Sequence, residues 1–220
     1  MSESSSLFGP AERKVLFDPF NSDNPVTIQV LGICSALAVT GQLKPSLVMG
    51  AAVIVVLVGA NVIVSVLRKM IPAKVRIIVE MVVVASMVIM VDQVLKAFLY
   101  DQSKELSVFV GLIITNCIVL GRLEAFALGN KVWPSLLDGI GNGMGYAIVL
   151  AMIGFVRELF GSGKLFGAPV IPETWYYNPG TGSGWYVNNG MLVLPPAAFL
   201  ILGFICWGQQ TYNLRKGAKK

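Results

Sequence analysis

Six apolar segments run through this chain, and two of them are shorter than a membrane-spanning helix. A helix needs about 20 residues to cross the hydrocarbon core of a bilayer. The first and fourth segments have 15 residues each, and the other four are long enough. Short or interrupted helices persist at membrane depth only where other protein covers them. The segments are Pro25–Val39, Pro45–Leu67, Ala73–Leu99, Leu106–Leu120, Pro134–Phe160 and Met191–Tyr212.

The composition supports a membrane protein and excludes several other classes. Charged residues make up 13% of the chain, whereas soluble domains carry about 25%. The net charge of +5 does not indicate nucleic-acid binding, because most basic residues flank apolar segments and none forms a basic motif with interleaved aromatic residues. The sequence contains no histidine, which excludes imidazole metal ligands and a histidine proton switch.

The positions of lysine and arginine predict how the six spans are oriented. The side of the membrane that would hold both termini carries twelve of these residues, and the opposite side carries five. The positive-inside rule therefore predicts a cytoplasmic tail at residues 1–24, a basic cytoplasmic tail at 213–220 and a periplasmic loop at 163–189. The aromatic residues of that loop suit either a membrane-interface belt or an ordinary surface loop.

An internal repeat relates the two halves of the chain. A shift of 89 residues places Pro45-Ser46-Leu47 on Pro134-Ser135-Leu136, Gly50 on Gly139 and Arg68 on Arg157. Each half, 25–99 and 106–212, holds three spans, and an odd number reverses the orientation of the second half. We therefore expect an all-α polytopic membrane protein with two inverted three-helix repeats, a fold class that places its functional site near the midplane.

Two cysteines occupy equivalent places in the two short segments. Allowing six extra residues in the second half, Cys34 falls on Cys117, whereas Cys206 has no repeat partner and suits ordinary packing. Thiolates are ligands for zinc, copper(I) or iron–sulfur clusters. Zinc and 2Fe–2S sites use four protein ligands, so a second subunit would have to complete such a site. A disulfide and inert packing remain open alternatives.

Several motifs resemble the D subunits of the bacterial Na⁺-translocating NADH:quinone oxidoreductases, which form a family with the homologous E subunits and the Rnf membrane subunits. The similarity extends from Pro25 to Trp207. The most specific strings are Thr115-Asn116-Cys117-Ile118-Val119 and Gly121-Arg122 with Glu124-Ala125-Phe126-Ala127. Further similarity is found in Asp138-Gly139-Ile140-Gly141-Asn142-Gly143 and Arg157-Glu158-Leu159-Phe160-Gly161.

The resemblance implies an electron-transfer subunit of the bacterial inner membrane. It implies that Cys34 and Cys117 bind a 2Fe–2S cluster shared with a homologous E subunit, which would supply two further cysteines. Electrons would pass from a cytoplasmic NADH-oxidising subunit towards a periplasmic flavin subunit, and the complex would export Na⁺. The chain has no NAD fingerprint of its own, so it would not be a complete enzyme.

Acidic residues inside the predicted spans are candidates for an ion path, since a buried charge in a membrane is costly. Glu80 and Asp92 lie in the third segment and Asp138 in the fifth. We expect Asp92 and Asp138 to mark a Na⁺ path near opposite membrane faces. Alternatively, Asp92 pairs with Lys96 and Asp138 stabilises a helix N-terminus.

Three polar residues near the fourth segment have expected roles. Asn116 is expected to satisfy exposed backbone or to hydrogen-bond a cluster sulfide, and Arg122 and Glu124 are expected to make helix or subunit contacts. Two alternatives to the leading function remain: the equivalent Rnf subunit, and a stand-alone secondary transporter, which the inverted repeat by itself would favour.

Overall fold

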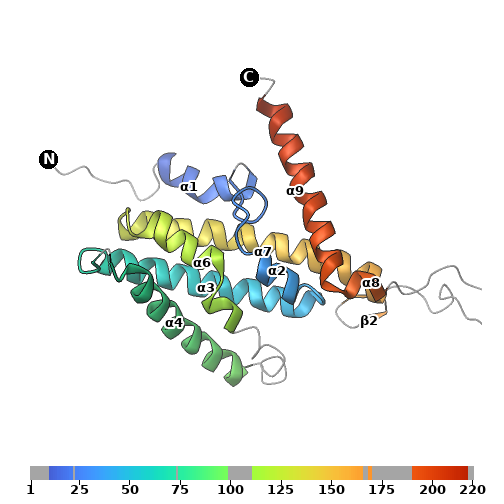
Figure 1. The fold of residues 1–220 in the computed structure, drawn as a ribbon, viewed down its shortest axis with the longest axis horizontal. Coiled ribbons are helices and arrows are strands. Elements are labelled where there is room, and N and C mark those ends of the chain that lie inside the picture. The colour runs from blue at the N-terminus through green and yellow to red at the C-terminus, as the bar shows by residue number, and fades with distance from the viewer. Residues whose placement is uncertain are drawn as a thin grey trace, which may run out of the picture.

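The computed structural model describes residues 10–21, 23–72, 74–98, 111–165, 168–169 and 190–217. This part of the chain is almost entirely helical (Figure 1), which confirms the expected all-helical class. The helices are α1 (Pro10–Asn21), α2 (Ile33–Val39), α3 (Leu43–Leu67), α4 (Arg76–Phe98), α6 (Cys117–Arg122), the π-helix η1 (Leu123–Ala127), α7 (Val132–Ser162), α8 (Gly190–Val193) and α9 (Pro195–Gly217). Two short strands, β1 (Lys164–Leu165) and β2 (Ala168–Pro169), pair antiparallel.

Among the described residues, three helices are long and apolar enough to cross a membrane. They are α3, α4 and α7, and they coincide with the second, third and fifth predicted spans. The sixth predicted span overlaps two helices, α8 and α9, which are separated at Leu194, so it is not one continuous helix. The polar end of α9, which includes Gln209 and Gln210, lowers its hydropathy. Residues 106–110 and most of the predicted periplasmic loop, with its aromatic residues, lie outside the described residues.

Both short apolar segments are interrupted, as their lengths predicted. In the first segment only α2 is helical, and the turns before it include Val30 at φ 58° and Gly32 at φ 79°. The left-handed conformation is strained for a β-branched residue such as Val30 but open to glycine. In the fourth segment residues 111–114 are helical, the helix stops at Thr115 and Asn116, and α6 begins at Cys117.

The central pair of the bundle is α3 and α7, which lie side by side and antiparallel (Figure 1). Small residues let the two helices approach closely. A Cβ added at Gly50 would lie 2.9 Å from Cβ of Ala147, and one added at Gly139 would lie 3.1 Å from Cα of Val58. These two contacts exchange under the 89-residue shift, which carries residue 50 to 139 and residue 58 to 147.

A third contact between α3 and α7 maps onto itself. A Cβ at Gly143 would lie 2.9 Å from Cγ1 of Ile54, and the 89-residue shift carries residue 54 to 143. The contacts between α3 and α7 are thus reciprocal about the pair formed by Ile54 and Gly143.

The two arginines matched by the repeat bind corresponding places. Arg157 on α7 donates to Thr40 Oγ1 at 2.6 Å and to the carbonyl of Leu37 at 3.5 Å, both beyond or near the end of α2. Arg68, at the end of α3, donates to the carbonyl of Gly129 at 3.4 Å, beyond the end of η1. Each arginine therefore contacts the segment that links the short helix of the other half to its long helix.

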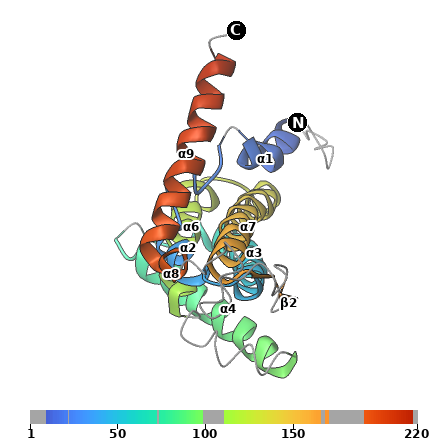
Figure 2. The same cartoon turned by 90° about the vertical axis from the view of Figure 1, so that its right-hand side faces the viewer.

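The region read from the sequence as a polar tail contains the helix α1, which packs on α7 (Figures 1 and 2). Gly141 and Gly145 make this approach possible, since a Cβ at either position would lie 2.9 Å from the carbonyl oxygen of Leu16 or Pro19. These glycines lie two residues along the helix from Gly139 and Gly143, so α7 presents glycine to α1 on one face and to α3 on another.

The helices α4 and α9 expose many apolar side chains. The helix α9 projects steeply away from α7 (Figures 1 and 2). Only 17% of the apolar window of α4 is buried, compared with 50% for α3 and 56% for α7. Phe204 and Trp207 of α9 are each 70% exposed. These side chains are free to meet lipid or other subunits.

Candidate functional site

The fold brings the two repeat-related cysteines into contact. The Sγ atoms of Cys34 and Cys117 lie 3.7 Å apart. Cys34 is the second residue of α2 and Cys117 the first residue of α6, so each thiol sits where an interrupted segment becomes helical. Both side chains are exposed in the single chain. The pair therefore forms at a surface, and this surface is open to a neighbouring molecule.

A buried polar cluster lies directly behind the two sulfur atoms. Ser35 Oγ lies 2.5 Å from the hydroxyl of Tyr146, and Asn116 Nδ2 donates to Ser35 Oγ at 3.1 Å. Asn116 Oδ1 accepts from the backbone N–H of Ile118 at 3.3 Å and so caps α6. Satisfying exposed backbone is one of the two roles expected of Asn116.

The described residues contain no group of three or more cysteine, histidine, aspartate or glutamate side chains that could hold a metal ion. Among these residues the thiol pair therefore has no third candidate ligand beside it. Its separation nevertheless fits one metal, since two thiolates bound tetrahedrally at about 2.3 Å lie about 3.8 Å apart. The observed 3.7 Å matches that spacing.

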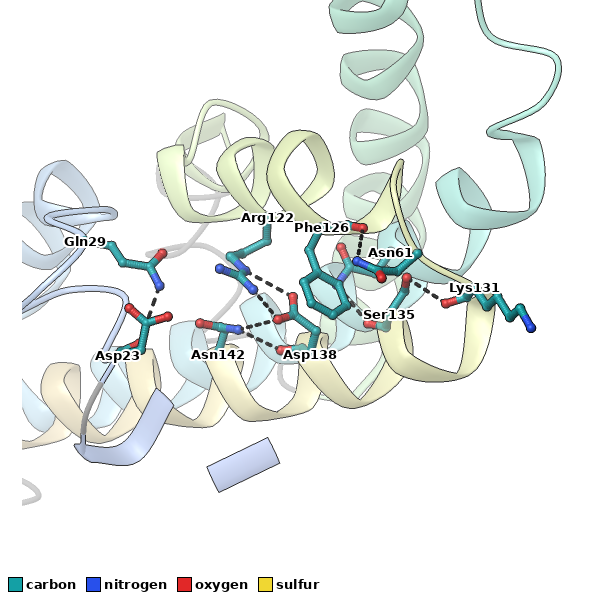
Figure 3. A network of polar contacts seen from close by, with 10 residues as sticks. Asp23, Gln29, Asn61, Arg122, Phe126, Lys131, Ser135, Asp138 and Asn142 are labelled. Carbon is teal, nitrogen blue, oxygen red and sulfur yellow. Dashed lines mark hydrogen bonds and ion pairs between the residues drawn. The ribbon is translucent and has the colours of Figure 1, made fainter. Parts of the chain in front are cut away.

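A second polar cluster surrounds Asp138, in the second turn of α7 (Figure 3). Arg122 of α6 forms a bidentate ion pair with its carboxylate, including an Nε to Oδ2 bond of 3.0 Å. Asn142 Nδ2 donates to Asp138 Oδ1 and to its backbone carbonyl, both at 3.0 Å. Asp138 is only 1% exposed. Its charge is thus balanced within the chain, and Arg122 makes the helix contact expected of it.

The other acidic residues singled out from the sequence lie outside these two clusters. Asp92 pairs with Lys96 one turn further along α4, at 2.5 Å, as one of the two sequence interpretations predicted. Glu80 is buried on the same helix, and its Oε1 atom has no hydrogen-bond partner among the described residues. Glu124 of η1 pairs with Arg76 of α4, which is a helix contact of the expected kind.

Comparison with known proteins matches residues 13–206 to the family described as Rnf-Nqr subunit, membrane protein. This match covers most of the chain. The chain belongs to the Rnf-Nqr family of membrane subunits. Its structure is thus that of a membrane protein, in agreement with the three apolar helices.

Proteins of this family with curated names include close relatives of the chain. It is 55% identical to the D subunit of the Na(+)-translocating NADH-quinone reductase of Pseudomonas aeruginosa (strain LESB58), over 93% of this chain and 88% of that protein. The D subunit of Photobacterium profundum is also 55% identical, over 89% of this chain and 90% of that protein. The D subunit of Aeromonas hydrophila is 55% identical, over 90% of this chain and 92% of that protein.

Sequence reasoning found both cysteines but missed Ser35 and Tyr146. Tyr146 lies inside a long apolar segment, where an aromatic residue suggests ordinary core packing. Ser35 follows Cys34 directly, and serine is common near breaks in membrane helices. The one signal that could have found them was the repeat, which places Tyr146 opposite Leu57 and Ser35 opposite Ile118, a polar residue opposite an aliphatic one in each case.

Proposed function

We propose that this chain is the D-type membrane subunit of a Na⁺-translocating NADH:quinone reductase and contributes Cys34 and Cys117 to a 2Fe–2S cluster shared with a homologous E-type subunit. The observation that carries the proposal is the 3.7 Å separation of two exposed thiols in a chain 55% identical to proteins named as D subunits. Bound there, the cluster would supply one-electron transfer across the membrane core.

The spacing of the thiols supports binding to one iron ion. Two thiolates on the same tetrahedral metal lie about 3.8 Å apart, close to the observed 3.7 Å. A 2Fe–2S cluster takes four cysteines, two for each iron. Cys34 and Cys117 would hold one iron, and the other iron would be left for the partner.

The exposure of the thiols supports a partner that covers them. A complementary pair of cysteines on a homologous six-helix subunit would complete the ligand set and shield the site from water. The other partners of the proposal are the cytoplasmic NADH-oxidising subunit, the periplasmic flavin subunit and the lipid of the bacterial inner membrane. Both termini would lie in the cytoplasm, in keeping with the excess of lysine and arginine on that side.

We also propose that the full chain has six spans arranged as two inverted repeats. Three kinds of observation support this arrangement: the reciprocal glycine contacts of α3 and α7, the matching contacts of Arg68 and Arg157, and the contact between the two matched cysteines. An axis through the 54–143 and 34–117 contacts would relate the halves. The partner would cover the face of the molecule at which this axis passes between the two cysteines.

Asp92 and Asp138 remain our candidates for a Na⁺ path. Asp138 is buried against Arg122, so a cation reaching its carboxylate would have to compete with the guanidinium. Na⁺ passage at Asp138 would therefore involve a movement of Arg122, which lies on the same helix, α6, as Cys117. That linkage gives a route by which a change at the sulfur pair could reach an ion site.

An Rnf subunit is the nearest alternative, because the family model covers both kinds of complex. Identity of 55% to proteins named as D subunits of the quinone reductase, over most of both chains, favours the quinone reductase. A stand-alone transporter would have no use for a thiol pair at metal-binding distance on its surface.

The proposal is tested by Cys34→Ser in the assembled complex. We expect the variant to lose the 2Fe–2S signal in electron paramagnetic resonance, to lose the corresponding iron and to stop quinone reduction. Cys206→Ser is the matched control, since Cys206 lies on α9 and forms no three-cysteine cluster with the pair, and it should retain all three properties. A Cys34→Ser complex with unchanged signal and iron content would overturn the assignment.

A further inference from the structure

We propose that the hydroxyl of Tyr146 is a positioning group that fixes the two cysteine-bearing segments relative to each other, through Ser35 and Asn116. The inference rests on the proposed function and deepens it, since it concerns the same site. Tyr146 belongs to α7, Ser35 to α2, and Asn116 to the break before α6. Ser35 follows Cys34 and Asn116 precedes Cys117, so one buried hydroxyl joins the immediate neighbours of both sulfur atoms.

Only one assignment of donors and acceptors satisfies all the hydrogen bonds of this cluster. Ser35 Oγ donates its single proton to the carbonyl of Gly32 at 2.9 Å. It must therefore accept from the Tyr146 hydroxyl at 2.5 Å, and it also accepts from Asn116 Nδ2 at 3.1 Å. Asn116 Nδ2 donates its second proton to the Tyr146 oxygen at 3.4 Å. All three side chains are buried, with Ser35, Asn116 and Tyr146 each 0% exposed.

The same tyrosine ring also holds the strained turn before Cys34. A Cβ at Gly32, which has φ 79°, would lie 2.9 Å from Cε2 of Tyr146 and 3.4 Å from Asn116 Oδ1. Val30, two residues earlier, is in the left-handed region as well. Strained backbone of this kind persists where its surroundings hold it. Tyr146 therefore fixes α2 by ring packing and by a hydrogen bond.

The repeat shows that the fold itself does not require these polar groups. The positions matched to Tyr146, Ser35 and Asn116 are Leu57, Ile118 and Ile33. All three are aliphatic, and Leu57 and Ile118 are completely buried. The matched positions are thus filled by side chains that form no hydrogen bonds. Buried polar groups in a membrane are costly, and their presence beside the sulfur pair points to a role in setting the geometry of the site.

The test measures the spacing of the sulfur atoms without relying on the cluster. The full-length chain, made in membranes without its partner subunits and with Cys206→Ser, would be treated in parallel with two thiol reagents. Copper–phenanthroline with oxygen joins the thiols directly, and the two thiols lose two protons and two electrons to oxygen. A short bifunctional methanethiosulfonate instead bridges them through a spacer: each thiol loses its proton, forms a disulfide with one end of the reagent and displaces one methanesulfinate. The ratio of direct to bridged product reports how closely the sulfurs are held.

We expect Tyr146→Phe to lower this ratio roughly tenfold, a shift of the size expected when a buried partner of a hydrogen bond is removed. Ser35→Ala, which breaks the same cluster from α2, should give a similar decrease. Ser135→Ala is the matched control, because it removes a buried hydroxyl of α7 that donates to the carbonyl of Lys131, away from the thiols. The control should leave the ratio at the wild-type value.

A second readout uses the assembled complex. Tyr146→Phe should retain iron but shift or broaden the cluster signal in electron paramagnetic resonance, whereas Ser135→Ala should not. Unchanged ratios in both Tyr146→Phe and Ser35→Ala would overturn the positioning role. If Tyr146→Phe does not fold, the reagent ratio of Ser35→Ala alone tests the positioning role. If the wild-type complex shows no cluster signal, the proposed function fails, and the reagent ratio still tests the role of Tyr146.

Discussion

The thiol pair and the Asp138 cluster are two polar sites in the same apolar bundle, and they are completed in opposite ways. Asp138 is buried and its charge is matched by Arg122 and Asn142 of the same chain. Cys34 and Cys117 lie at the surface, with no further metal-binding side chain beside them in the described residues. The difference concerns where each site finds its partners: the Asp138 carboxylate is paired within this chain, whereas the proposed cluster at the thiols would take its other ligands from a second subunit.

The largest effect should follow from breaking the buried ion pair. Arg122→Leu leaves the Asp138 carboxylate buried without its counter-ion, which costs about 3–5 kcal/mol for buried pairs. The unfolding temperature of the detergent-solubilised chain should therefore decrease strongly. The double variant Arg122→Leu with Asp138→Leu should recover most of the loss, because it removes both charges. If Arg122→Leu alone were as stable as the wild type, the Asp138 carboxylate would not depend on Arg122 as its counter-ion.

A smaller effect is expected at the crossing of α3 and α7, which supports both sites. Gly143→Ala would place a methyl group 2.9 Å from Ile54 Cγ1 and 3.2 Å from its Cα atom. Overpacking of this kind costs about 1–3 kcal/mol. Gly203→Ala on α9 is the control, since nothing in the described residues lies within 4 Å of its added Cβ. Equal unfolding temperatures for the two variants would contradict a close crossing at this point.

Lys96→Ala tests a partly exposed ion pair within α4, which differs from both the buried Asp138 cluster and the thiol pair. Lys96 is half-exposed and pairs with Asp92 one turn away on α4. Exposed pairs of this spacing contribute about 0.3–0.5 kcal/mol. The unfolding temperature should therefore change little, and a loss comparable to that of Arg122→Leu would show that Asp92 has a structural role that its geometry does not suggest.

The smallest effect on stability is expected at the cysteines themselves. Cys34→Ser changes an exposed side chain, and such substitutions usually stay within about 0.5 kcal/mol. The isolated variant chain should unfold like the wild type, although the complex would lose its cluster. A large loss of stability in the isolated chain would instead give the thiol a structural role within this subunit.

The sequence predicted more about the broken segments than about the contacts behind them. A 15-residue apolar run cannot cross a bilayer as one helix, so the interruptions before α2 and α6 followed from length. The repeat then predicted that Cys34 and Cys117 occupy corresponding places. Residues close in the fold but distant in sequence, such as Arg122 and Asp138, carried no such periodic signal. The helix α1 was also missed, because its mixed composition resembles that of a polar tail.

The pattern of apolar residues by itself determined that this chain is a membrane protein, that the second, third and fifth segments form continuous long helices, and which residue types are rare enough to matter. These properties follow from helix length and from the cost of polar groups in hydrocarbon. Only the tertiary structure decided that the two sulfur atoms meet at 3.7 Å on an open surface, that Asp138 is neutralised by Arg122, and that Tyr146 joins the segments around the thiols. Distances between helices depend on how glycine-lined faces pack, and such packing is set by the whole bundle.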